Sequence, residues 1–267
     1  MINKNDIEEL IEQGLTLKKI AVELNVSYNT ILRWCKKYSL TSKTGSKGAK
    51  KYNLNENFFE MIDTEDKAYW LGFLAADGNI HATVKGKAIN RLQINLKADD
   101  TYHLEKFQKA LNSNFPINLK TINNSQAAEL KINSKKICDD LIKSNITPRK
   151  SLIVEMPDNL PKNLVPHYIR GYFDGDGCIK NYKDKNNRHR YSFSIVGGID
   201  MLEQIQAKLP CSIPIYKIKR CKDIFSLETT KKENIISIYD YLYTNATIYL
   251  ERKKDIFDDL MSRLIEI

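Results

Sequence analysis

The chain has 267 residues, of which 42% are hydrophobic, so it is long enough for one large folded domain, or for one domain with a small appendage. Its formal charge of +9 points to a polyanionic partner, nucleic acid first, against the alternative of a merely basic protein. The five cysteines are odd in number and lack C-x-x-C spacing, which argues against a disulfide framework or a structural zinc site.

Targeting signals are not visible in the letters. The first residues, MINKNDIEEL, are polar and acidic, unlike a signal peptide, and no apolar run approaches the roughly 20 residues that a bilayer span needs. We therefore expect a protein that is not secreted and has no membrane partner. The expected location is the cytoplasm, in association with the nucleoid, or an organellar matrix.

Residues 1–40 have the pattern of a helix-turn-helix. Apolar residues recur at helical spacing from Ile7 to Leu15, a second short run surrounds Ile20, and Ser27 can cap a third helix. The stretch 24–55 contains seven Lys and Arg and no Asp or Glu, which suits phosphate contact. We expect the third helix to enter a major groove, against the alternative of a small bundle without a DNA role. The residues expected to contact DNA there are Tyr28, Asn29, Arg33, Lys36 and Lys37.

A basic linker and a duplicated domain are predicted to follow. Residues 41–52 carry Gly, Ser, Thr and Lys without apolar periodicity, which is typical of a flexible linker. The second domain, residues 53–267, contains two similar segments: YWLGFLAADG at 69–78 and YIRGYFDGDG at 168–177. We place repeat one at about 58–155 and repeat two at about 160–262.

Each repeat has the predicted order α-β-β-α-β-β-α. Residues are assigned to one of the two strands before the second helix, to that helix, to two more strand candidates and to a last helical segment. In repeat one the assigned ranges are 91–97, 101–111, 117–122, 129–133 and 137–150. In repeat two they are 190–195, 200–209, 215–220, 225–229 and 238–253. A tandem duplication of this kind predicts an α+β, pseudo-two-fold domain with the first helix of each repeat at the shared axis.

The two first helices are predicted to pack against each other. Small residues four positions apart remove side chains from one patch of each helix and allow a close approach: Gly72 and Ala76 in the first, Gly171 and Gly175 in the second. Each helix should end at its aspartate, because the glycine that follows fits the left-handed position beyond a helix C-terminus.

The paired aspartates, Asp77 and Asp176, are poorly placed for stability. An anion is disfavoured at a helix C-terminus, and two such ends brought together repel each other. One carboxylate therefore needs a raised pKa, or cations must lie between them. Carboxylates, phosphate oxygens and water are typical ligands of Mg²⁺, so we expect these side chains to bind Mg²⁺ or Mn²⁺ with the adjacent backbone of Ala76 and Gly175. For either Asp-Gly pair alone, an ordinary turn is the alternative.

Polar strand faces are the predicted reading surface for DNA, since Arg, Gln and Asn can recognise guanine and adenine edges. In repeat one the side chains expected on this face are Arg91, Gln93, Asn95 and Lys97, and in repeat two Lys217 and Lys219. The segment 181–190 is interpreted as a mobile basic loop that tracks phosphates, against the alternative of a solvated surface loop. Its contributors would be Lys183, Lys185, Arg188 and Arg190.

WLGFLAADG at 70–78 and IRGYFDGDG at 169–177 resemble the paired signature of LAGLIDADG homing endonucleases in their single-chain, two-motif form. The resemblance covers about residues 55–260. It implies two saddle-shaped antiparallel sheets astride DNA, with the motif helices between them and the final aspartates as metal ligands. The resemblance also implies a basic residue near the end of each repeat, close to the scissile phosphates, and cuts that leave short 3′ overhangs.

Lys150 and Lys253 stand at the positions of those basic residues, with Lys254 and Arg252 as rivals in the second repeat. They would polarise water or stabilise developing charge, although a lysine near DNA can also be a phosphate contact only. Two features depart from the family pattern. Ala75 replaces an acid that the second copy keeps as Asp174, and a helix-turn-helix ahead of the first motif is not universal.

We therefore predict a monomeric, metal-dependent homing endonuclease that hydrolyses both strands of a long asymmetric DNA target. It would belong to an intron or another mobile element. A regulator that binds DNA without cutting is one alternative, whose mark would be loss of a motif-ending aspartate; both are present. An RNA maturase on the same scaffold, with intron RNA as partner, stays open as a second alternative.

Overall fold

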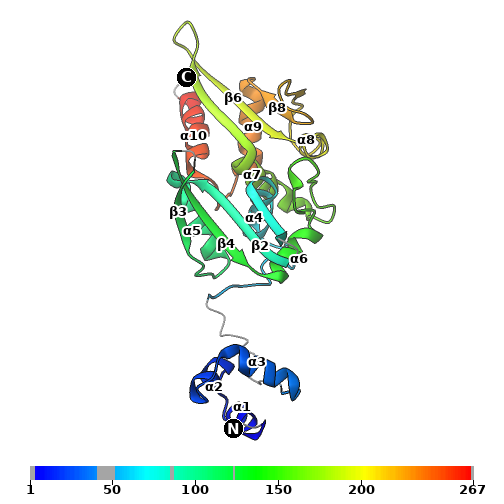
Figure 1. Ribbon diagram of the computed structural model, residues 1–267. Helices are drawn as coiled ribbons and strands as arrows, with labels where there is room; N and C mark the ends of the chain where they lie inside the picture. The colour runs from blue at the N-terminus through cyan, green and yellow to red at the C-terminus, as the bar shows by residue number, and fades with distance from the viewer. Residues whose placement is uncertain (1–3, 41–51, 85–86, 123, 266–267) are drawn as a thin grey trace. The chain divides into compact units, whose positions relative to one another are not determined.

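The computed structural model of the protein describes residues 4–40, 52–84, 87–122 and 124–265 (Figure 1). The chain divides into two compact units, Met1–Asn53 and Leu54–Ile267. The predicted linker at 41–52 lies outside the described residues except for Tyr52. None of the helices in the described ranges is long and apolar enough to cross a membrane.

The first unit contains three short helices, α1 (Lys4–Glu12), α2 (Leu17–Glu23) and α3 (Tyr28–Lys37). Ser27 caps α3 by accepting a hydrogen bond from the backbone N–H of Thr30 at 3.1 Å. The turn between α2 and α3 contains Asn25 in the left-handed conformation, with φ of 50°. The small core is built from side chains of all three helices: Ile7, Ile11, Ile20, Ala21, Ile31 and Cys35.

The second unit is built twice, which confirms the predicted α+β architecture. Its first half contains α4 (Glu65–Asp77), β1 (Gly78–Val84), β2 (Lys87–Lys97), α5 (Thr101–Ala110), β3 (Ile117–Ile122), β4 (Ser125–Asn133) and α6 (Lys135–Lys143). Its second half contains α7 (Val165–Asp176), β5 (Gly177–Lys183), β6 (His189–Gly197), α8 (Ile199–Gln206), β7 (Ile215–Lys217), β8 (Phe225–Thr229), α9 (Lys232–Tyr243) and α10 (Glu251–Ile265). Each half forms one antiparallel four-stranded sheet, in the order β1-β2-β4-β3 or β5-β6-β8-β7.

Each sheet has one apolar face and one polar face, because side chains alternate along a strand. Leu92 and Ile94 of β2 are buried, as are Phe193 and Ile195 of β6. Helices α5 and α6 contact the first sheet, and α8, α9 and α10 contact the second (Figure 1). The helices therefore cover the apolar faces, and the opposite faces carry the polar residues of β2 and β6.

Two strands lie where the sequence assigned no residues. β1 and β5 begin at the glycine of each Asp-Gly pair and form hairpins with β2 and β6. The expected loop at 181–190 is consequently wrong in extent, since its two ends belong to β5 and β6. Only residues 184–188 form the turn, where the Asp184 side chain accepts hydrogen bonds from the backbone N–H groups of Asn186 and Arg188.

The last helical segments also differ from the prediction. The segment 137–150 is helical only to Lys143, and 238–253 is divided between α9 and α10. In both places an asparagine in the left-handed conformation follows the helix end, Asn145 with φ of 66° and Asn245 with φ of 58°. Asparagine tolerates this backbone better than most residues, so the helices stop there.

Candidate active site

Helices α4 and α7 touch backbone to backbone. A Cβ added to Gly72 would lie 1.9 Å from the carbonyl oxygen of Tyr168, and one added to Gly171 would lie 2.0 Å from that of Tyr69. Any larger residue would force these helices apart, because the obstructing atoms belong to the main chain. This contact brings the C-terminal ends of the two helices together.

Each of these helices ends at its aspartate, Asp77 in α4 and Asp176 in α7. The expected left-handed glycine is wrong: Gly78 has φ of −73° and Gly177 has φ of −95°, and both begin strands. Glycine is needed there for space, not for a positive φ. A Cβ at Gly78 or Gly177 would lie 2.6 Å or 2.5 Å from the carbonyl oxygen four residues earlier.

The two carboxylates repel each other, as expected from their placement. Asp77 is half-buried, and desolvation followed by the negative charge of Asp176 raises its pKa to about 6. Asp176 is more exposed, yet enough protein surrounds its carboxyl group for desolvation to raise its pKa too. The positive charges of Lys150 and Lys253 oppose both shifts. An apo site of this kind favours the binding of additional positive charge.

One buried lysine lies at each helix end. Lys150 Nζ donates a hydrogen bond to the carbonyl oxygen of Ala76 at 2.6 Å, and burial lowers its pKa. Lys253, which is 4% exposed, has its pKa lowered to about 8, mainly by burial. Its ammonium donates to three carbonyl oxygens, those of Phe173, Asp174 and Gly177, at 2.6, 2.8 and 2.6 Å.

The rivals of Lys253 are engaged elsewhere. Arg252 forms an ion pair with Asp100 at 3.0 Å, and Lys254 forms one with Asp258 at 2.6 Å. Of these three consecutive basic residues, Lys253 is therefore the one that contacts the end of α7. The pseudo-two-fold arrangement of the helix ends extends to a lysine at each.

The donor set fits a divalent cation that is shared with a substrate. In the described residues, His, Cys, Asp and Glu side chains do not gather in groups of three or more that could hold a metal ion by themselves. Mg²⁺ is commonly bound by one or two carboxylates plus substrate phosphates, which Asp77 and Asp176 could provide with DNA. A Cβ at Gly175 would meet the Asp77 carboxylate at 3.4 Å and the Cβ of Ala76 at 2.3 Å, so glycine keeps the space beside that carboxylate open.

The polar face of the first sheet carries the predicted side chains and several others. Arg91, Gln93, Asn95 and Lys97 alternate with the apolar residues of β2. Glu129 lies in the same face, 5% exposed, with ion pairs to Lys120 and Lys131. The two lysines of β3 and β4 were missed, although both strand segments had been assigned. Their alternation with Leu119 and Leu130 was the available signal.

The polar face of the second sheet differs from the prediction. Lys217 pairs with Phe225, which follows the same face as buried Leu227, so the expectation that it lies on the polar face is wrong. Lys219 lies in a turn beyond β7. The strand has only three residues, and shifting a strand by one position moves every side chain to the other face.

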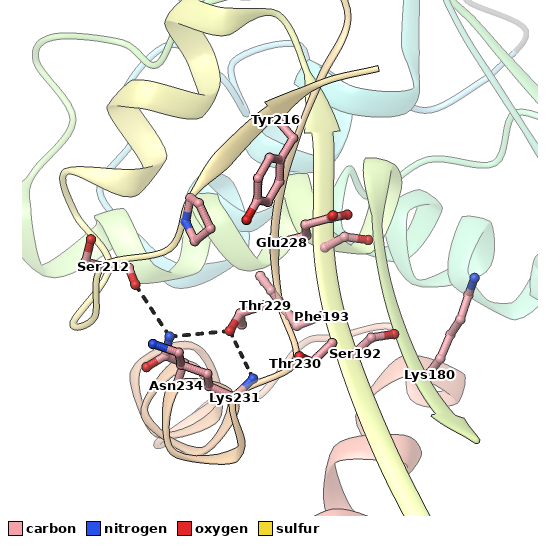
Figure 2. A pocket seen from close by; sticks show the side chains of 12 residues that line it. Lys180, Ser192, Phe193, Ser212, Tyr216, Glu228, Thr229, Thr230, Lys231 and Asn234 are labelled. Atoms are coloured by element: carbon pink, nitrogen blue, oxygen red, sulfur yellow. Dashed lines mark hydrogen bonds between the residues drawn. The ribbon is translucent and has the colours of Figure 1, made fainter. Parts of the chain in front are cut away.

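A hollow of about 530 Å³ opens on this second polar face (Figure 2). Figure 2 shows Tyr216, Glu228, Ser192 and Lys180 around it, on neighbouring strands. Glu228 is exposed, and its carboxylate accepts a hydrogen bond from the hydroxyl of Ser226 at 3.1 Å. Lys180 and Tyr216 were missed because β5 was not assigned and β7 was assigned with the wrong face, whereas Ser192 and Glu228 lie in strand segments that had been assigned.

The remaining predicted DNA contacts are dispersed. In the first unit, all five candidates on α3 are exposed: Tyr28, Asn29, Arg33, Lys36 and Lys37. In the hairpin of β5 and β6, Lys183, Lys185 and Arg188 are exposed, and Arg190 lies on the polar face in an ion pair with Asp184.

Comparison with known proteins identifies the architecture. No protein-family model matches the chain, and no curated protein matches it significantly. Among solved structures, DNA-bound meganuclease I-SmaMI matches with a TM-score of 0.52 at 16% identity, over 76% of this chain and 89% of that one. The LAGLIDADG homing endonuclease I-GzeII, in complex with its DNA target, matches with a TM-score of 0.52 at 16% identity, over 74% and 90%. The LAGLIDADG meganuclease I-AabMI gives 0.50 at 13% identity, over 76% and 92%.

The chain has the LAGLIDADG homing endonuclease fold. Within this fold, α4 and α7 are the two motif helices, and their aspartates, lysines and glycines occupy related places in the two halves. The sequence reasoning missed one component of the LAGLIDADG core, a set of buried polar residues. No role was assigned to His103 from the sequence, and Asp174 was identified only as the motif acid that the second copy keeps.

These buried polar residues belong to two clusters between the halves. Tyr69 donates a hydrogen bond to Asp174 at 2.7 Å and contacts His103 at 2.9 Å. Arg170, with no exposed surface, forms an ion pair with Glu65 at 2.6 Å. A charged residue inside an otherwise apolar helix was the signal for both Arg170 and Asp174, since buried charges require partners.

Proposed function

We propose that this chain is a site-specific homing endonuclease that hydrolyses both strands of a long, asymmetric double-stranded DNA target with Mg²⁺ or Mn²⁺. The observation that carries the proposal is the meeting of the two motif helices, with Asp77 and Asp176 at their ends and one buried lysine beside each. The net charge of +9 and the polar sheet faces support DNA as the substrate. The matched I-SmaMI and I-GzeII structures are themselves bound to DNA.

In this proposal Asp77 and Asp176 hold the divalent cations against the scissile phosphates. A bound cation supplies charge neutralisation and an activated water. Lys150 and Lys253 add fixed positive charge where negative charge develops, and each serves one of the two strands. Their burial keeps them in place, because each ammonium is hydrogen-bonded to main-chain oxygen.

DNA recognition is assigned to the sheet faces and to the first unit. Arg91, Gln93 and Asn95 would contact base edges, while surrounding lysines contact phosphates. The exposed basic surface of α3 would extend the recognised site. Removing residues 1–53 should shorten the nuclease footprint on DNA and leave cutting at saturating protein intact. Loss of cutting in that truncation would contradict a separate tethering role for the first unit.

The decisive experiment is a cleavage selection. The full chain is incubated with Mg²⁺ and a library of long randomised duplexes, and cut ends are sequenced. We expect discrete double-strand cuts that fall by at least about a hundredfold in Asp77→Asn and in Asp176→Asn, because each change removes a carboxylate ligand. Both variants should keep their affinity for the target in EDTA. Binding without cutting in Mg²⁺ or Mn²⁺ would replace the nuclease with a DNA-binding regulator, and preference for structured RNA would favour a maturase.

A further inference from the structure

Asp174 is a buried carboxylate in the last turn of a motif helix. It is 2% exposed and lies two residues before the end of α7. Its side-chain Oδ2 accepts two hydrogen bonds, from the hydroxyl of Tyr69 at 2.7 Å and from the backbone N–H of Leu250 at 2.8 Å. Such a group is expensive to bury, so its partners indicate what it holds in place.

The first partner connects Asp174 to the other half of the domain. Tyr69 has one hydroxyl proton, which goes to Asp174, so its oxygen accepts the hydrogen bond that joins it to His103 Nε2. His103 is buried and neutral, because burial and nearby cations lower its pKa to about 3. His103 therefore donates to Tyr69, and Tyr69 donates to Asp174, so both hydrogen bonds run in the same direction.

The second partner connects Asp174 to the lysine. Leu250 immediately precedes α10, and its carbonyl oxygen accepts the backbone N–H of Lys253 at 3.0 Å. The Asp174 side chain thus fixes the first turn of α10, where an anion is also favoured by the helix dipole. The main-chain oxygen of Asp174 accepts a hydrogen bond from Lys253 Nζ at 2.8 Å. One residue consequently fixes both the backbone and the ammonium of Lys253.

In the described residues of the first half, Lys150 lacks a corresponding carboxylate contact to its helix. Ala75 occupies the position that corresponds to Asp174. Lys150 lies in a three-residue 3₁₀ turn after Arg149, whose φ is 61°, and its ammonium donates to the single carbonyl oxygen of Ala76 among the described residues. The two lysines are therefore held with unequal rigidity, although they lie at equivalent helix ends.

We propose that Asp174 is a positioning residue for Lys253, so that the two DNA strands are cut by centres that differ in preorganisation. The proposal rests on the nuclease function proposed above and adds a functional asymmetry to it. Misplacing a catalytic group by about 1 Å can cost about a hundredfold in rate. Loss of Asp174 should therefore slow cleavage of the strand that depends on Lys253 and leave the rate of cleavage of the strand that depends on Lys150 unchanged.

The test uses the full chain, Mg²⁺ and the duplex recovered in the cleavage selection, with each strand end-labelled separately. In Asp174→Ala we expect one strand to be cut about tenfold or more slowly, the other within about twofold of wild type, and nicked product to accumulate. Asp174→Asn keeps an oxygen for the Leu250 N–H and should recover part of the lost rate on that same strand. Tyr69→Phe should slow cleavage of that same strand by a smaller factor.

Ala75→Ser is the matched control at the corresponding position of α4, and it should leave the ratio of the two strand rates unchanged. Equal slowing of both strands in the Asp174 variants, or no slowing, overturns the proposal, since a merely structural role has no preferred strand. Should Asp174→Ala fail to fold, the strand ratios of Asp174→Asn and Tyr69→Phe decide. Absence of cutting by the wild-type chain would instead overturn the nuclease function itself.

Discussion

Helices α4 and α7 have the same place in the two halves and different interiors. Leu71 and Ala75 of α4 correspond to Arg170 and Asp174 of α7. The first pair belongs to an apolar core, whereas the second pair binds the segment that connects α9 to α10. The duplication is therefore close in backbone, while the interior polarity of each half has adapted to what packs beside it.

The contacts of Arg170 show why the second helix carries charge. Its guanidinium donates to the carbonyl oxygens of Ile248 and Leu242 at 2.8 and 2.6 Å, and to Glu65 at 2.6 Å. Glu65 in turn accepts from the backbone N–H of Thr247 at 2.8 Å. The planar, multiply donating fork of arginine suits these separate acceptors. It anchors the chain between α9 and α10, whereas in the described residues of the first half α6 is the last α-helix.

The largest effect on stability is expected when α7 is made to resemble α4. Arg170→Leu copies Leu71, removes one donor from Glu65, and takes the guanidinium away from two main-chain oxygens. We expect the free energy of unfolding to fall by about 3–5 kcal/mol, the usual cost of removing one partner from a buried pair. Urea unfolding monitored by circular dichroism measures the change. Leu71→Met, a volume-conserving control, should cost less than about 1.5 kcal/mol. An unchanged midpoint in Arg170→Leu would mean that an apolar interior serves both helices equally well.

A smaller effect should separate the two polar faces. Gln93 pairs with Lys131 in the first sheet, and at the corresponding register Ser194 pairs with Glu228 in the second. Lys131→Gln should weaken DNA binding and reduce the salt dependence by about one counterion, because a cation is lost. Glu228→Gln should tighten DNA binding by up to about fivefold. The change removes a negative charge from a face that, under the proposed function, lies near the negative phosphates. Binding titrations in EDTA at several salt concentrations provide the measurement. Changes of the same sign in both variants would contradict the difference between the faces.

The smallest effect concerns the stability of the paired helix ends. The folded-state pKa of Asp77 is about 6, above the ordinary value of 3.8, so ionisation costs stability; this cost accumulates as the pH rises from 3.8 to about 6 and is fully present above that pH. Asp77→Asn removes that cost. In EDTA and without DNA, we expect the variant to be more stable than wild type by about 1 kcal/mol at pH 8, after allowance for solvent screening, and equally stable near pH 4. Urea unfolding at both pH values tests this. A variant less stable than wild type at pH 8 would show that the carboxylate is stabilised by its lysines.

Much of the fold could be predicted because its signals are local. The alternation in 91–97 and 190–195 and the paired small residues of the motif helices each require only neighbouring letters. The strands β1 and β5 were harder to predict, since Gly78 and Gly177 are typical of residues that end a helix and begin a turn. Buried Arg170 could not be placed from sequence, because a charge in an apolar helix has no visible partner until Glu65 and the chain near Ile248 are brought beside it.

The site was predictable to a similar degree. The Asp-Gly repeats located the two helix ends, and the resemblance pointed to Lys150 and Lys253 among several basic residues. The face of Lys217 was wrong because β7 is short and its register depends on pairing with β8. The role inferred for Asp174 depends on contacts with Tyr69 and Leu250, which lie 105 and 76 residues away in sequence.

The contact of Gly72 and Gly171 with opposing main-chain oxygens has a consequence for how targets could change. Under the proposed function this contact sets the distance between the two cut positions. It consists of main-chain atoms, which substitutions elsewhere leave in place. Residues on the sheet faces can be substituted without changing this contact, and such substitutions would alter the DNA sequence that is recognised. The stagger between the broken strands would then be inherited unaltered by every descendant that keeps both glycines.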